Sequence, residues 1–404
     1  MSGLFLFFCT MKVILFDDSN RNALFPLTLT RPVADIRVGI LKIHEKWSTY
    51  LKAEVAFKTA PYLQVKFPFS ISEENIFING SVLPNNQILE AIDNMQEGDL
   101  LYSGETLLVA KINGSEAGNF DCSLSGTLNK IAYSGELQQI KYPEEIFSKN
   151  SQQIQADFDL LTKGRTSASL SSTNVIIGDN IFVEEGVEVE CSNLNTKNGP
   201  IYLGRNSQVW EGSNIRGSFA LCEDSQIKMG AKIYGGTTVG PMSRVGGEIN
   251  NAVIFGYSAK GHDGYLGNAV VGEWCNFGAD SNNSNMKNNY AEVKIWDYIT
   301  ERFRKTGLQF CGLIMGDHSK CGINTMFNTG TVVGVSANIF GAGFPRVFIP
   351  DFSWGGAQGF EDYALNKAIA TAKLAYERKE KVFDEVEVDI FNHLYKLTEK
   401  SRRF

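Results

Sequence analysis

The sequence predicts an α/β domain followed by a β-solenoid and a C-terminal helix. The strongest observation is a sixfold spacing of aliphatic residues, which runs through Leu203, Val209, Ile215, Leu221, Ile227, Ile233, Val239 and Val245. This period fits neither an α-helix nor a pleated strand. Short solenoid strands, however, each turn one aliphatic side chain inward and need small residues at the corners. The other two observations are apolar runs mixed with helical patterns before residue 160, and an amphipathic pattern after residue 359.

The composition is that of a globular protein with room for two or three domains. The 404 residues are 43% hydrophobic and 21% charged, with a formal net charge of -7. An acidic chain without a basic stripe is not expected to bind nucleic acid. The seven cysteines include no close CxxC pair, which indicates reduced thiols in a cytoplasm. The apolar run at residues 1–10 is too short to cross a membrane, so we expect no membrane association and interpret Met11 as the start.

We expect the first domain to span residues 11–160 and a polar linker to span residues 161–174. Residues 12–16 read as a buried strand, residues 17–21 as a polar loop, and residues 36–47 have helical spacing. Ligands of α/β domains collect at the carboxyl ends of parallel strands, so the polar loop is a candidate nucleotide-binding loop.

The run PLTLTRP at residues 26–32 resembles the opening of the sugar-phosphate nucleotidyltransferases. In that family a GxGTR loop precedes a proline-containing stretch that ends in a lysine. Here the glycines and the lysine are absent, and residues 17–20 take the place of the loop. The resemblance implies an Mg²⁺-dependent reaction with a nucleoside triphosphate. It implies phosphate contacts from Arg21, Arg31 and Lys46, and metal ligands at Asp17 and Asp18, although each of these charges could equally be an exposed surface charge.

We expect the solenoid to span residues 175–358 and the helix to span residues 359–404. The sixfold spacing slips after Val245 and returns at Met315, and unusual polar runs occupy the interval. Residues 286–310 add a basic, aromatic insertion, and such loops commonly line a binding site. Function is therefore expected at this break in the repeat.

His262 lies in the break, in a tight turn with Gly261 and Gly264. A histidine at a solenoid corner is not a core residue, and an imidazole can accept a proton near neutral pH. The residue pattern alone fits a catalytic base and a surface histidine equally well.

Residues 240–287 resemble the acetyltransferase half of the bifunctional N-acetylglucosamine-1-phosphate uridylyltransferase and glucosamine-1-phosphate N-acetyltransferase family. Three segments carry the resemblance: GPMSR at 240–244, GHDGYLG at 261–267 and NFGA at 276–279. It implies that His262 is the base. It also implies that the sugar phosphate is bound by Arg244, Tyr265, Asn276 and Asn285.

The same resemblance implies a left-handed solenoid, a homotrimer with the site between subunits, and acetyl-CoA as co-substrate. The implied acyl-donor residues are Ala279, Ser281, Lys320 and Arg346. The family's GAGT motif reads GADS here, so Asp280 replaces a glycine near the expected donor site.

We therefore expect a cytoplasmic transferase that acetylates glucosamine 1-phosphate and then joins the product to a uridine nucleotide. One alternative is a nucleotidyltransferase for another sugar 1-phosphate, such as a glucose-1-phosphate thymidylyltransferase or a mannose-1-phosphate guanylyltransferase, with a purely structural solenoid. Another is a scaffold that binds nucleotide sugars without turnover.

Overall fold

The structure is a computed structural model that describes residues 11–121 and 128–402, so the expected extension at residues 1–10 lies outside the described residues. The chain divides into two compact units. The first contains residues up to 21, residues 31–35 and residues 42–141, and the second contains residues 22–30, residues 36–41 and the chain from 142 onward. None of the described helices is long and apolar enough to cross a membrane.

The first unit is built on a mixed sheet with the strand order β2-β1-β3-β5-β4-β6. Strand β1 is parallel to β2 and β3, whereas β5 is antiparallel to β3 and β4. An apolar cluster that includes Ile14, Phe77 and Phe120 forms its core. The strands are β1 (Lys12–Phe16), β2 (Val55–Lys58), β3 (Asn75–Asn79), β4 (Asp99–Ser103), β5 (Thr106–Lys111) and β6 (Asn129–Ala132). The helices are α1 (Ile43–Leu51), α2 (Asn86–Asp93) and α3 (Gly114–Gly118).

The expected helix at residues 36–47 begins only at Ile43, so the prediction was wrong for residues 36–42. Residues 36–41 belong to the second unit, where they lie against helix α4 (Pro143–Thr162). Gly39 has a φ of +82°, and a Cβ there would lie 2.7 Å from the backbone oxygen of Gln153. This close approach requires an irregular backbone that a helix cannot provide.

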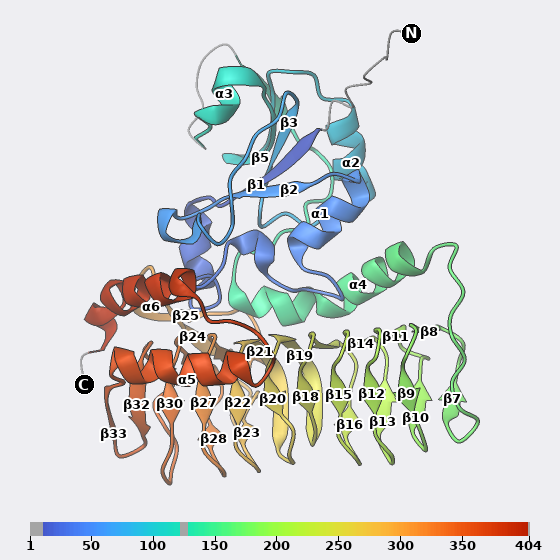
Figure 1. Cartoon of the computed structure of the whole chain (residues 1–404), viewed down its shortest axis with the longest axis vertical. Helices are drawn as coiled ribbons and strands as arrows, with labels where there is room; N and C mark the ends of the chain where they lie inside the picture. The colour runs from blue at the N-terminus through green and yellow to red at the C-terminus, as the bar shows by residue number, and fades with distance from the viewer. Residues whose placement is uncertain (1–10, 122–127, 403–404) are drawn as a thin grey trace. The chain divides into compact units, whose positions relative to one another are not determined.

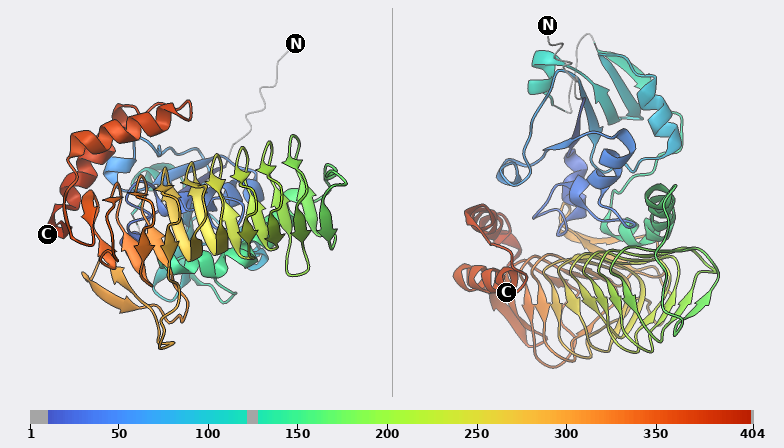
Figure 2. Two further views of the ribbon diagram at one scale, coloured as in Figure 1. Left: turned by 90° about the horizontal axis from the view of Figure 1, so that it is seen from below. Right: turned by 45° about the vertical axis from the view of Figure 1, so that its right-hand side comes forward.

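The second unit contains a parallel β-solenoid whose short strands stack in ladders (Figures 1 and 2). The first ladder begins with β7 (Val175–Ile177), β10 (Asn193–Asn195), β13 (Asn214–Arg216) and β16 (Lys232–Ile233). The second begins with β8 (Ile181–Val183), β11 (Ile201–Leu203), β14 (Phe219–Leu221) and β17 (Thr237–Val239). The long strands β19 (Glu248–Gly256) and β21 (Tyr265–Glu273) continue both ladders, and β26 (Leu313–Met315), β29 (Thr331–Val333) and β31 (Phe348–Ile349) follow in the second.

The third ladder carries three of the residues predicted to be functional, Arg244, Asn276 and Lys320. It consists of β9 (Glu188–Val189), β12 (Gln208–Val209), β15 (Gln226–Ile227), β18 (Arg244–Val245), β20 (Ala259–Lys260), β22 (Asn276–Phe277), β27 (Lys320–Cys321), β30 (Asn338–Ile339), β32 (Ser353–Gly356) and β33 (Gly359–Asp362). A short separate pair is β23 (Asn282–Asn283) with β28 (Met326–Phe327).

The sixfold spacing is confirmed as the inward-facing register of the solenoid. All the aliphatic residues of the uninterrupted run from Leu203 to Val245 are at most 2% exposed, and they belong to one continuous core cluster. Each coil buries its aliphatic side chains on those of its neighbours, so the hydrophobic gain is shared along the stack.

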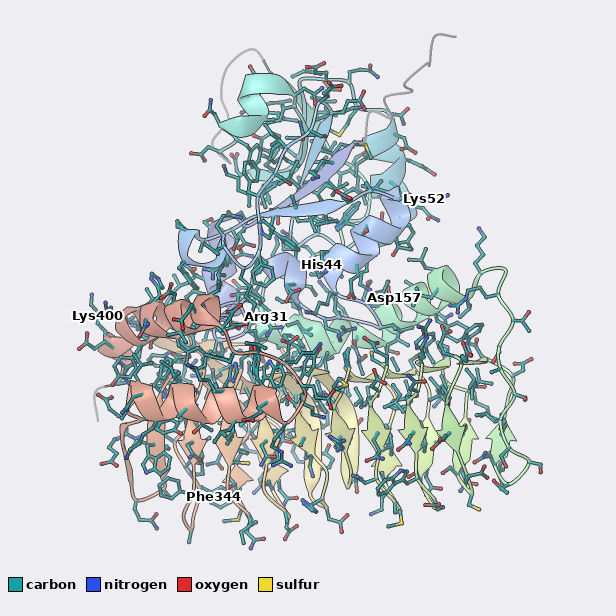
Figure 3. The ribbon with its side chains drawn as sticks, in the orientation of Figure 1. Arg31, His44, Lys52, Asp157, Phe344 and Lys400 are labelled. Atoms are coloured by element: carbon teal, nitrogen blue, oxygen red, sulfur yellow. The ribbon has the colours of Figure 1, made fainter. Side chains whose placement is uncertain are left out.

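Helix α4 packs on the solenoid and belongs to the second unit, although we expected it within the first domain. Asp157, labelled in Figure 3, accepts hydrogen bonds from the backbone nitrogens of Ile40 (2.8 Å) and Leu41 (3.0 Å). Asn150 donates to the backbone oxygen of Gly236 at 2.8 Å. An amphipathic pattern shows that a helix has a buried face, but it does not show which domain covers that face.

The insertion at residues 286–310 forms an antiparallel hairpin of β24 (Lys294–Asp297) and β25 (Arg302–Lys305). Both terminal guanidinium nitrogens of Arg304 donate to the carboxylate of Glu144, at 2.6 and 2.7 Å. The same guanidinium lies 3.9 Å from the ring centroid of Tyr142. The hairpin is therefore tied to the start of α4.

Replacing Arg304 with methionine should lower the free energy of unfolding by about 3 kcal/mol, because the mostly buried carboxylate of Glu144 would lose its bidentate partner. The midpoint and slope of urea unfolding measure this loss. Lys305→Met is the matched control, since Lys305 is 71% exposed and its pair with Glu292 should contribute less than about 1 kcal/mol. Equal midpoints for the two variants would contradict a structural role for the Arg304 pair.

The C-terminal segment contains two helices, α5 (Leu365–Glu377) and α6 (Glu385–Leu397), so the single predicted helix was wrong. The chain breaks between them because Glu380 adopts a φ of +55° and Asp384 caps α6 by accepting from the backbone nitrogen of Glu387. The indole of Trp274 stacks on the Tyr376 ring with the centroids 3.9 Å apart, which fixes α5 against the solenoid.

Candidate functional site

A lysine enters the aliphatic interior where the repeat slips. In the third ladder Lys260 pairs with Val245, so its side chain takes an inward position, and it is 2% exposed. Its ammonium donates to the backbone oxygens of His262 at 2.8 Å and Asp263 at 3.1 Å. Burial lowers the pKa of Lys260 to about 8, and Cys321 and nearby carboxylates oppose the shift. Sequence reasoning missed this residue. The repeat predicts an aliphatic side chain one coil after Val245, and Lys260 occupies that position.

His262 is exposed on the turn between β20 and β21. The turn fits closely between its neighbours. A Cβ on Gly264 would lie 2.2 Å from the backbone oxygen of Ser281, and a Cβ on Gly247 would lie 2.6 Å from that of Gly264. The backbone nitrogen of Asp280 also donates to the Asp263 oxygen at 3.1 Å. The buried Lys260 ammonium binds the backbone of this turn from the interior of the solenoid. The turn therefore holds the exposed His262 imidazole on a backbone that its neighbours keep in place.

Tyr265 and Asn285 meet beside this turn. The amide of Asn285 donates to the Tyr265 hydroxyl at 2.9 Å and to the side-chain oxygen of Asn268 at 2.9 Å. Burial raises the pKa of Tyr265, so the phenol keeps its proton and can both donate and accept. Two of the predicted sugar-binding residues are thus in direct contact, and Tyr265 lies three residues after His262 in the chain.

Arg244, Asn276 and Lys320 line a pocket between the third ladder and α5, which we call the α5 pocket. They lie in register along the ladder, where Arg244 pairs with Ala259, Ala259 with Asn276 and Asn276 with Lys320. The pocket has a volume of about 590 Å³. The predicted sites therefore fall into two groups, one in the α5 pocket and one at the His262 turn.

The residues expected to bind the acyl donor are not brought together. Ser281 is 1% exposed, and its hydroxyl donates to the backbone oxygen of Gly278 at 2.8 Å, so its side chain faces the interior. Arg346 is exposed and Ala279 is partly buried, and neither lines the α5 pocket. Only Lys320 of this group lies there.

The carboxylates expected to hold Mg²⁺ in the first unit are occupied by protein donors. Asp17 accepts from the backbone nitrogen of Val33 at 2.9 Å and from the Thr59 hydroxyl at 2.6 Å, and lies 3.2 Å from the Arg21 guanidinium. Burial raises the pKa of Asp17 to about 6, and Arg21 opposes the shift. The described residues contain no cluster of three or more histidine, cysteine or acidic side chains placed to hold a metal. This arrangement does not fit a magnesium site.

Asp18 is similarly engaged, because its carboxylate accepts from the Asn79 side chain and from the backbone nitrogen of Asn20.

The three predicted phosphate contacts are also buried. Arg31, labelled in Figure 3, is 2% exposed and lies 3.6 Å from Asp35, and Lys46 is 1% exposed. Arg21 is 7% exposed and donates to the Tyr62 hydroxyl at 2.7 Å. Their charges face protein groups in this conformation.

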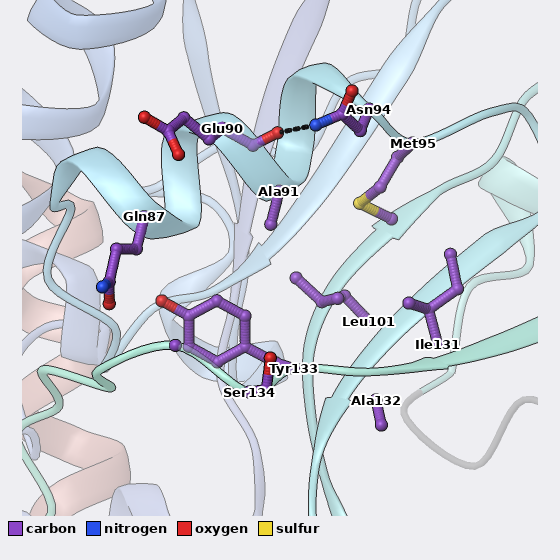
Figure 4. A pocket seen from close by; sticks show the side chains of 11 residues that line it. Gln87, Glu90, Ala91, Asn94, Met95, Leu101, Ile131, Ala132, Tyr133 and Ser134 are labelled. Atoms are coloured by element: carbon purple, nitrogen blue, oxygen red, sulfur yellow. Dashed lines mark hydrogen bonds between the residues drawn. The ribbon is translucent and has the colours of Figure 1, made fainter.

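A pocket of about 470 Å³ lies in the first unit beside α2, and Figure 4 shows the side chains that line it. Its lining includes Gln87, Glu90 and Tyr133 but no lysine or arginine. Without a cation the pocket has no charge to hold a triphosphate.

One protein family and two curated relatives match parts of this chain. Residues 13–166 match the family described as sugar nucleotidyl transferase. The bifunctional protein GlmU of Methanocaldococcus jannaschii is 31% identical over 87 residues, which cover 22% of this chain and 21% of the relative. A bifunctional sugar-1-phosphate nucleotidylyltransferase/acetyltransferase of Sulfurisphaera tokodaii is 27% identical over 152 residues, which cover 33% of this chain and 37% of the relative. The chain therefore spans well under half the length of either curated relative.

Two solved structures align with the chain at 15% identity. One is the Arabidopsis UDP-N-acetylglucosamine acyltransferase, with a TM-score of 0.21 over 58% of this chain and 94% of that one. The other is the same enzyme from Campylobacter jejuni, with a TM-score of 0.22 over 57% and 82%. Scores this low support no conclusion about fold or function. From the family match and the strand ladders together, the chain combines a domain of the sugar nucleotidyl transferase family with a parallel β-solenoid.

Proposed function

We propose that this protein is a bifunctional transferase that acetylates a hexosamine 1-phosphate at the solenoid and transfers a nucleotidyl group to the product through its N-terminal domain. The family match over residues 13–166 supports the second activity. The observation that carries the first is the exposed imidazole of His262 on a turn held by both neighbouring coils and by the buried Lys260.

In the proposed acyl transfer, the amine nitrogen of the sugar attacks the thioester carbonyl of acetyl-CoA. The His262 imidazole accepts the proton that the amine loses, the carbon–sulfur bond breaks, and coenzyme A leaves as the thiol after protonation. Tyr265 and Asn285 offer a hydroxyl and an amide beside the turn for sugar hydroxyl groups. Arg244 supplies a positive charge for the phosphate. The fixed backbone matters because orientation of the base and the amine lowers the barrier.

The nucleotidyl transfer requires the first unit to expose charge that is buried in this conformation. Arg21 and Arg31 are the candidates for binding the triphosphate. The guanidinium of Arg21 lies beside the carboxylate of Asp17, and that of Arg31 lies beside the carboxylate of Asp35. We propose that the triphosphate competes with Asp17 and Asp35 for these guanidinium groups. Uridine as the nucleotide, Mg²⁺ as the cofactor, a homotrimer and a cytoplasmic location remain predictions from resemblance.

A substrate panel tests the two activities separately. Full-length protein is incubated with UTP, dTTP or GTP and a set of sugar 1-phosphates, and with acetyl-CoA and glucosamine 1-phosphate. We expect pyrophosphate release with UTP and N-acetylglucosamine 1-phosphate, and free thiol release in the acetyl-CoA reaction. Omitting the sugar phosphate is the control for hydrolysis of either co-substrate.

The second candidate is a nucleotidyltransferase whose solenoid is only structural. The burial of Ser281 and the separation of the expected acyl-donor residues favour it. Pyrophosphate release without thiol release would select this candidate. If no combination of substrates releases pyrophosphate or free thiol, both enzymatic hypotheses are contradicted. The non-catalytic scaffold is then the remaining hypothesis.

A further inference from the structure

The α5 pocket concentrates positive charge in an acidic chain. Four cations line it, Arg244 and Lys320 from the third ladder and Arg378 and Lys379 from the turn directly after α5, and the lining contains no aspartate or glutamate. Among the described residues, none of these four side chains forms an ion pair with a carboxylate within 4.0 Å. The whole chain has a net charge of -7, so this cluster opposes the overall balance.

The cations of the α5 pocket repel one another, which makes their protonated forms less favourable. The pKa of Lys379 falls to about 8, first because of burial and then because of Arg244 and Arg378. Burial also lowers the pKa of Lys320. Like charges that are partly removed from water disfavour their own protonated forms, and an anion placed between them would reverse this effect.

Neutral groups hold two of the four cations in position without cancelling their charge. The Lys379 ammonium donates to the Met242 backbone oxygen at 2.8 Å, and the Lys320 ammonium donates to the His318 oxygen at 3.0 Å. The carbonyl end of α5 contributes the equivalent of only about half a negative charge. The Trp274–Tyr376 stack fixes α5, and Arg378 and Lys379 follow directly after this helix, so their placement beside the ladder is part of the fold.

We infer that the α5 pocket binds a phosphate-bearing ligand with more than one negative charge, and that Arg378 and Lys379 contact its phosphate together with Arg244. The nature of the ligand rests on the proposed function, which offers two phosphate esters, a hexosamine 1-phosphate and coenzyme A. Tyr257 and Trp274 also line the pocket, and its volume of about 590 Å³ leaves room for an organic group next to the phosphate.

Isothermal titration of the full-length protein tests the site with four probes: inorganic pyrophosphate, glucosamine 1-phosphate, coenzyme A and uncharged N-acetylglucosamine. The test variant is the double substitution Arg378→Gln and Lys379→Gln. The matched control is Lys367→Gln and Lys373→Gln, which removes the same charge from exposed positions of α5 outside the pocket. A charge-assisted hydrogen bond typically contributes enough that losing one weakens binding about tenfold or more. We expect the test variant to weaken binding of pyrophosphate and of one phosphate ester by at least that factor, and the control to change it less than about threefold.

The probe that responds identifies the ligand as the sugar phosphate or the acyl donor. Binding that is equally weakened in both variants, or unchanged in the test variant, would overturn the inference, as would a wild-type protein that binds no phosphate probe at millimolar concentration. Acyl transfer by the wild-type protein with unchanged phosphate binding in the test variant would refute the α5 site alone. A different outcome is that the wild-type protein binds phosphate but shows no acyl transfer, and that the test variant loses the phosphate binding. This outcome would refute the proposed function and support the α5 site.

Discussion

Replacing His262 with alanine is expected to lower the rate of acyl transfer by about 10²-fold or more, which is the usual contribution of a positioned general base. The imidazole is exposed on a turn whose backbone contacts both neighbouring coils, so its removal should leave the solenoid intact. The rate constants of thiol release and the melting temperature, measured on the same preparation, separate chemistry from folding.

The nucleotidyl transfer activity serves as an internal control, because His262 lies outside residues 13–166 that match the nucleotidyl transferase family. Asp263→Asn is the neighbouring control, since Asp263 is exposed on the same turn and its backbone oxygen, rather than its carboxylate, makes the hydrogen bonds described above. A loss of less than about threefold in His262→Ala would show that another group accepts the proton. An equal loss in both variants would show that the turn matters for its shape alone.

The solenoid was predictable because its determinant is local and repeated. Each coil needs aliphatic residues at the same positions of the repeat, and the run from Leu203 to Val245 has one at every sixth position. The break in the C-terminal helix depends instead on a positive φ at Glu380 and on the cap at Asp384. The amphipathic pattern continues through this break, so the sequence alone predicts one helix where the structure has two.

The candidate site was predictable only in part. Resemblance picked out Tyr265 and Asn285, which do meet, and Arg244, Asn276 and Lys320, which share a pocket. It could not show that Ser281 points inward or that Arg378 and Lys379 approach the ladder.

These placements arise from packing between segments far apart in the chain. In the first unit the same is true of Arg21, whose partners include Tyr62, and sequence reasoning cannot tell such a buried arginine from one that is open to phosphate.

Replacing Lys260 with methionine is expected to lower the turnover number of acyl transfer by about tenfold with little change in KM, because the ammonium positions the His262 turn from below and does not reach the substrate. The pKa of this lysine falls from its ordinary value of 10.5 to about 8 on folding. The folded protein therefore binds the proton less tightly than the unfolded chain, and the free energy of unfolding rises as the pH increases from about 8 to about 10.5. Methionine removes this titration.

The variant should therefore show a flatter dependence of the melting temperature on pH over that range, and a melting temperature at pH 7 that does not fall, since a buried charge has been replaced by an apolar side chain of similar length. Lys232→Met is the matched control, because Lys232 is a 65% exposed lysine on a nearby coil and should change neither the rate nor the pH profile. A Lys260→Met protein that melts at a lower temperature and turns over normally would show that the lysine only closes the solenoid. A protein that is stable but slow requires the other explanation, in which a buried cation is kept in an aliphatic interior because it holds the backbone of the catalytic turn in place.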